Sequence, residues 1–110
     1  MTIKNKTRDT ILAQNVIEAK SLKDQTIGLL KYKNPTALLI KTNFGIHTFF
    51  MNYAIDVLVL DRANTVVAIK EDLKPNTVFF WNPKYGTILE LPSGTIAKTR
   101  TVINDKITLL

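Results

Sequence analysis

The 110-residue chain has no cysteine, so it cannot form a disulfide framework, a thiolate metal site or a cysteine nucleophile. It has two serines, Ser21 and Ser93, and neither stands in a nucleophile-elbow pattern, which leaves a serine hydrolase without a basis. The four glycines are dispersed and form no glycine-rich phosphate loop. We therefore expect no nucleotide and no other cofactor.

Long hydrophobic runs are also missing. Nowhere do eighteen apolar residues follow one another, so no membrane-spanning helix is predicted. The basic N-terminus is not followed by an apolar stretch of secretory length, because Gln14, Asn15, Glu18 and Lys20 interrupt it. We expect a cytoplasmic protein with no membrane partner.

Positive charge is in excess, with 15 lysines and arginines against nine acidic residues and a net charge of +6. The basic residues are scattered from Lys4 to Lys106, and no five of them are consecutive. This distribution favours a solvated, lysine-rich surface. Binding of a nucleic acid is the alternative.

The chain has the size of one domain with a single hydrophobic core, spanning residues 1–110. From Thr36 onward, short apolar runs alternate with turn residues, which is typical of β structure. These runs cover residues 37–40, 46–51, 57–60, 66–69, 77–81, 87–91 and 107–110. We predict a mostly β domain with one short helix, in a compact barrel-like antiparallel or mixed sheet.

Local signals refine this prediction. Short apolar stretches at residues 10–13 and 16–17 suit edge strands, and the segment from Ser21 to Asn34 suits a helix of two or three turns. Residues 57–60 are apolar at every position, so this strand should be buried on both faces and its hairpin should be central. Asn64, at the end of the four-residue hairpin connection, should adopt left-handed backbone angles.

Two segments carry a family signature. Residues 46–69 contain a histidine, an aromatic residue and a methionine, followed by Ile55 and Asp56, an apolar strand, and Asp61 before a second apolar strand. Residues 89–94 read Leu-Glu-Leu-Pro-Ser-Gly. Together they resemble domain-of-unknown-function family 192, over about residues 16–109.

The resemblance implies a small β-rich domain without an established activity. Gly28-Leu-Leu fits the family loosely, although Lys31 follows where the family usually has an arginine. Asn104-Asp105 stands in place of the family's glycine-aspartate turn, and asparagine also accepts left-handed angles.

His47 is the single histidine, so it cannot form the paired imidazole site that zinc or non-haem iron usually needs. Alternation along a strand would place His47, Phe49 and Met51 on one face, where a soft copper site is conceivable. The structural alternative, which we prefer, has Met51 in the core and His47 bonded to a turn. We predict no metal site.

Asp56 and Glu90 are carboxylates next to or within apolar strands. If they share a face, they supply an acid and a base for a small hydrolase or lyase assisted by His47. Otherwise each accepts hydrogen bonds from backbone amides at a strand end.

Aromatic residues gather at residues 44–53 and 79–85. Alternation puts Val78 and Phe80 on one face, and Phe79 and Trp81 on the other. An exposed pair of Phe79 and Trp81 near Lys84 would stack sugars or unpaired bases. The alternative is that they belong to a core.

The leading hypothesis is a non-catalytic binding module with an unidentified ligand, because the chain has many strands and aromatics but few catalytic groups. The alternatives are the hydrolase or lyase built on Asp56, Glu90 and His47, and a single-stranded nucleic-acid binder using a basic surface and Trp81.

Overall fold

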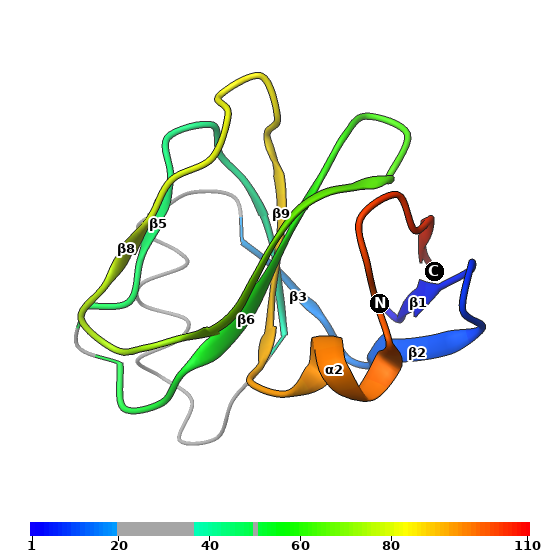
Figure 1. The fold of residues 1–110 in the computed structure, drawn as a ribbon, viewed down its shortest axis with the longest axis horizontal. Helices are drawn as coiled ribbons and strands as arrows, with labels where there is room; N and C mark the ends of the chain where they lie inside the picture. The colour runs from blue at the N-terminus through cyan, green and yellow to red at the C-terminus, as the bar shows by residue number, and fades with distance from the viewer. Residues whose placement is uncertain (20–36, 50) are drawn as a thin grey trace.

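The computed structural model describes residues 1–19, 37–49 and 51–110. This part of the chain holds ten strands and one short helix, which confirms the mostly β prediction (Figure 1). The elements are β1 (Ile3–Asn5), β2 (Thr10–Ala13), β3 (Ile17–Ala19), β4 (Leu38–Lys41), β5 (Ile46–His47), β6 (Ile55–Leu60), β7 (Val66–Leu73), β8 (Val78–Phe79), β9 (Thr87–Pro92), α2 (Thr95–Thr99) and β10 (Ile107–Leu109). The helix predicted within residues 21–34 lies outside the described residues.

The central feature is a five-stranded mixed sheet in the order β3-β4-β9-β6-β7. β3 runs parallel to β4, and the other neighbours are antiparallel. The remaining described strands pair among themselves, as a β10-β1-β2 sheet and a β5-β8 pair. The mixed sheet is as predicted, but its barrel-like closure is not, because within the described ranges the five-stranded sheet ends at β3 and β7 without closing.

All six residues of β6 are buried. Period-two alternation sends Leu58 and Leu60 to one hydrophobic cluster and Val57 and Val59 to another. The prediction of a strand buried on both faces is confirmed. β7 is an edge strand, so only the first strand of the hairpin is internal. Asn64 has a φ of 61°, which confirms the predicted turn.

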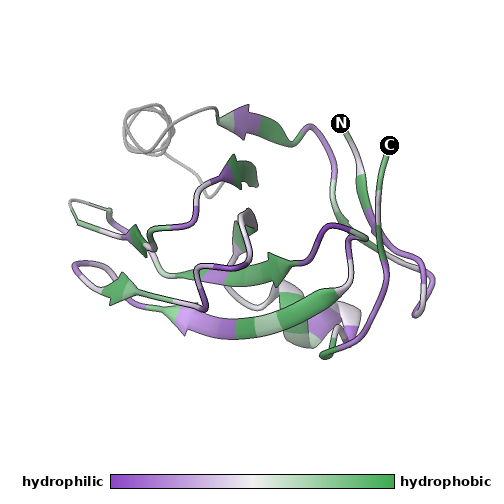
Figure 2. Cartoon of the chain, turned by 90° about the horizontal axis from the view of Figure 1, so that it is seen from above, coloured by the Kyte–Doolittle hydropathy of each residue, from purple (hydrophilic) through white to green (hydrophobic). Residues whose placement is uncertain are grey.

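Different elements cover the two faces of the central sheet. On the first face, Leu58 and Leu89 pack with Ile3 and Ile107 of the small sheet and with Ile96 of α2. On the second face, β5 and β8 and the residues around them cover the sheet, with Ile46, Phe79 and Trp81 in its cluster. Seen from above, the apolar strands of the central sheet lie between these layers (Figure 2).

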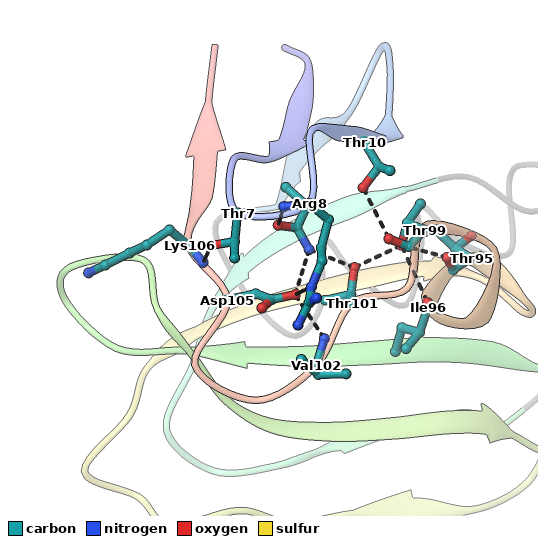
Figure 3. Close-up of polar contacts among 11 residues, drawn as sticks. Thr7, Arg8, Thr10, Thr95, Ile96, Thr99, Thr101, Val102, Asp105 and Lys106 are labelled. Carbon is teal, nitrogen blue, oxygen red and sulfur yellow. Dashed lines mark hydrogen bonds and ion pairs between the residues drawn. The ribbon is translucent and has the colours of Figure 1, made fainter.

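A buried polar network joins the two ends of the chain, which lie side by side because β1 pairs with β10. The Asn5 Nδ2 donates to Thr101 Oγ1 at 3.0 Å and to Asp105 Oδ2 at 2.9 Å. Arg8 Nε and the backbone N–H of Val102 also donate to Asp105 Oδ2 (Figure 3). Burial alone would raise the pKa of Asp105, but these hydrogen bonds and the Arg8 charge hold that pKa below its ordinary value.

The structure corrects the sequence prediction at two places. The strand that begins at Ile46 ends at His47, because Thr48 turns inward and its hydroxyl contacts the carbonyls of Lys74 and Thr77. Helix α2 was not predicted, since five residues carry too little periodicity. No helix within the described ranges is long and apolar enough to cross a membrane.

Candidate binding site at one end of the central sheet

Asp56 is fully buried and has a structural role. Its Oδ1 accepts the backbone N–H of Asp72 at 2.8 Å, and its Oδ2 accepts that of Ile96 at 2.9 Å. Helix α2 begins after Gly94 without a side-chain cap of its own and without an acidic residue in its first turn. Asp56 therefore supplies from β6 the acceptor that this helix start needs.

Glu90 is also fully buried, but on the other face of the sheet. In the pairing of β6 with β9, Asp56 lies opposite Leu91 and Val57 lies opposite Glu90. Directly opposed residues share a face and successive residues alternate, so the two carboxylates point away from each other across the sheet. The acid and base hypothesis needs the two carboxylates on one face, and this arrangement does not provide it.

Tyr53 lies near Glu90 on the second face. Burial raises the pKa of Tyr53, and the Glu90 carboxylate raises it further. Among the described residues, the Tyr53 hydroxyl has no hydrogen-bond partner. This phenol therefore stays protonated at neutral pH.

His47 and Met51 take different roles. Met51 is buried in the second cluster. The His47 ring stacks on Phe49 with centroids 4.9 Å apart, and its Nδ1 accepts the Phe49 backbone N–H at 3.3 Å. These contacts match the structural alternative, in which Met51 fills the core and His47 bonds a turn.

The packing of residues 78–81 matches the alternative in which Phe79 and Trp81 belong to a core, and not the stacking platform. Phe79 and Trp81 are half-buried against the second cluster, whereas Val78 and Phe80 are exposed. The Trp81 Nε1 donates to the Tyr85 carbonyl at 2.8 Å. Trp81 is thus bonded to the loop that carries Lys84.

Three connections between strands lie at the same end of the central sheet, and we call this end the loop end. The register aligns Thr87 with both Lys41 and Leu60. The connections 42–45, 61–65 and 82–86, which adjoin these three residues, therefore lie at the same end, along the upper edge of Figure 1. Asn43 Nδ2 donates to the Pro83 carbonyl at 2.8 Å, which joins two of them directly.

A cavity of about 450 Å³ opens between the hairpin tip and the 82–86 connection, and we call it the charged pocket. It is lined by Asp61, Arg62, Ala63, Lys84 and Tyr85. The Lys84 Nζ lies 5.8 Å from the centroid of the Tyr85 ring. Asp61 Oδ1 already accepts the N–H groups of Ala63 and Thr65, both at 2.9 Å. Within the described residues, neither Arg62 nor Lys84 forms an ion pair.

A second hollow, the aromatic groove, lies on the outer side of β5 and β8. It has a volume of about 180 Å³ and is lined by Phe44, Gly45, Ile46, His47, Phe49, Val78 and Phe80. Gly45 has a φ of +92°, and a Cβ there would lie 2.5 Å from Phe80 Cδ1. Phe80 can therefore lie against the backbone at Gly45 only because this residue is glycine.

The model of the DUF192 family, described as "uncharacterized ACR", matches residues 2–109, somewhat more than the resemblance in the sequence indicated. The chain belongs to the DUF192 family.

One relative supports this assignment, and two solved structures share the fold. This DUF192 chain is 31% identical to a UPF0127 protein of Thermococcus sibiricus over 112 residues, covering 94% of the chain and 71% of that relative. A crystal structure of a protein of unknown function from Novosphingobium aromaticivorans is similar in fold, with a TM-score of 0.80 and 14% identity, over 98% of this chain and 82% of that one. A crystal structure from Sinorhizobium meliloti has a TM-score of 0.75 and 14% identity, over 97% of this chain and 89% of that one.

Sequence reasoning selected Lys84 but missed its partners in the site. Arg62 stands in a hairpin turn and gave no signal of its own, because its position beside Lys84 depends on how β6 and β9 pair. Phe44 and Phe80 were noted as members of the two aromatic clusters, but neither was selected as a binding residue. Their exposure depends on the short β5-β8 pairing.

Proposed function

We propose that the protein is a non-catalytic binding module that takes an anionic ligand in the charged pocket. The observation that carries this proposal is the pair of cations, Arg62 and Lys84, which line one cavity and form no ion pair with any acidic side chain of the described residues. A cation already held in an ion pair would have to give up that partner before binding. In this pocket no such exchange is needed.

The chemistry of the pocket also favours an anion. Among the lining residues that the structure describes, Asp61 is the one carboxylate, and two backbone N–H groups already bind its Oδ1. Tyr85 adds an aromatic surface beside Lys84, which suits a ligand with a ring or sugar as well as a charge. The net charge of +6 would draw an anion towards the protein.

A catalytic role has less support. Asp56 and Glu90 are sealed on opposite faces of the sheet, and neither lines the charged pocket. His47 lies in the aromatic groove with its Nδ1 occupied by a backbone N–H. The three polar residues that the sequence offered for catalysis therefore do not converge on one reacting atom.

Titration of the ¹⁵N-labelled protein with inorganic tripolyphosphate, followed by amide chemical shifts, tests the proposal. We expect saturable shifts at residues 61–63 and 84–85, and their loss in the double variant R62Q/K84Q. The control K6Q/K98Q removes the same charge from exposed positions outside the pocket and should bind like the wild type. Shifts of equal size in both double variants would show general charge screening and would refute a specific site.

A further inference from the structure

The aromatic groove exposes two large apolar side chains. Phe44 is 83% exposed and Phe80 is 68% exposed, and both line the same hollow. Scattered exposed apolar residues are common, but clustered phenylalanines around a hollow indicate a binding surface. Phenylalanine has no polar tip, so the whole ring face is available for stacking.

The groove and the charged pocket are built on shared loops. Phe80 and Lys84 both lie between β8 and β9, and Phe44 lies in the 42–45 connection. That connection is bonded to the 82–86 connection through Asn43 and the Pro83 carbonyl, and through Thr42 N–H and the Gly86 carbonyl at 3.0 Å. A single extended ligand can therefore reach both the exposed aromatic rings and the two cations at one end of the molecule.

His47, which lines the groove, can supply a hydrogen-bond donor. His47 Nδ1 accepts the Phe49 N–H, so in the neutral imidazole the proton is on Nε2. This N–H can donate to a carbonyl or ring nitrogen at the edge of a planar group that lies on the phenylalanines. A purely apolar ligand would leave it unused.

We propose that the ligand is single-stranded nucleic acid, with bases stacked on Phe44 and Phe80 and phosphates held by Lys84 and Arg62. This inference rests on the proposed anion site and adds the chemical class of its ligand. Unpaired bases present flat faces to aromatic side chains, and the backbone supplies the negative charge. The sequence analysis assigned the stacking of bases to Trp81, whereas here Phe80, its exposed neighbour, stacks on a base.

Fluorescence anisotropy of a labelled oligothymidylate of about ten nucleotides tests the inference, because that length is within the usual site size of small single-strand binders. F44A and F80A should each weaken binding at least about fivefold, since stacking on one aromatic ring contributes that much or more per base. The control I11A removes an exposed apolar side chain away from the groove and should bind as the wild type does. Thermal unfolding followed by circular dichroism verifies that each variant is folded.

Salt dependence and competitors provide the second part of the experiment. Removing Lys84 or Arg62 should lower the slope of log affinity against log salt by about 0.7 for each phosphate that the variant no longer neutralises. A duplex of the same length should compete weakly, because its bases are already stacked. Vesicles containing an anionic phospholipid should not compete.

The outcomes separate this inference from the function on which it rests. The nucleic-acid inference is refuted if tripolyphosphate binds the charged pocket and the oligonucleotide does not bind. It is also refuted if tripolyphosphate binds and the oligonucleotide binds equally to wild type, F44A and F80A. In both cases the anion site stands. If anionic vesicles bind through Phe44 and Phe80 and the oligonucleotide does not, the groove is a lipid-contacting surface and the inference is wrong. If neither tripolyphosphate nor the oligonucleotide binds, both proposals fail.

Discussion

The carboxylate of Asp56 accepts a hydrogen bond of 2.9 Å from the backbone N–H of Ile96, 40 residues further along the chain. Through its other oxygen it also accepts the N–H of Asp72 at the end of β7. One buried side chain therefore holds an edge strand and the start of α2 in place. An aspartate that would suit catalysis by its chemistry is used here as a structural acceptor.

Replacing Asp56 should destabilise the protein because two backbone N–H groups would lose their acceptor in a buried site. We expect D56A to lower the free energy of unfolding by about 2–5 kcal/mol and D56N by less, since the amide oxygen still accepts one bond. Urea unfolding measures both. The matched control is D61A, which also removes an acceptor of two backbone N–H groups, but at a partly exposed turn where water replaces it. Equal destabilisation in D56A and D61A would contradict the proposed structural role.

Asp105 should make the stability depend on pH in acid. Its pKa is lowered in the folded protein, so its contribution is complete above the ordinary value of 3.8 and is lost as the pH falls through the folded value. The variant D105N should be less stable near neutrality by about 1–3 kcal/mol, because Arg8 and Asn5 lose a charged acceptor. Its free energy of unfolding should also fall less steeply below about pH 4.

The control for Asp105 is D9N. Asp9 also has a lowered pKa, through a hydrogen bond and charge from Lys4, but its side chain is 85% exposed. Exposed ion pairs contribute little to stability. Denaturant unfolding across the acid range should therefore separate D105N from the wild type and leave D9N close to it. If the free energy of unfolding of D105N changed with pH as that of the wild type does, the network would not depend on the charge of Asp105.

Gly45 and Gly94 allow a matched test of crowding in the aromatic groove. Both have a positive φ, +92° and +93°, so alanine should cost about 1–2 kcal/mol at either position through backbone strain. At Gly94 a Cβ would meet nothing within 4 Å, whereas at Gly45 it would meet the Phe80 ring and the Phe79 carbonyl. G45A should therefore unfold at a lower temperature than G94A and shift the ring resonances of Phe80. Identical melting temperatures would mean that Phe80 does not depend on Gly45.

The sequence by itself determined the class of this domain and several local features. Short apolar runs and turns rich in asparagine, aspartate and glycine produce strands and hairpins locally, so β6, β7 and the left-handed Asn64 were predictable. Asn104 likewise has a φ of 76°, as expected for a residue in place of the family's glycine. The absence of cysteine is a property of composition alone.

Only the tertiary structure decided where the polar and aromatic side chains point. Asp56 and Glu90 differ by one position in the register of β6 against β9, and that step places them on opposite faces of the sheet. Likewise, alternation divided residues 78–81 into two faces but could not tell which face the core would cover. The period of a strand is a local property, whereas register and coverage depend on contacts between residues far apart in the chain.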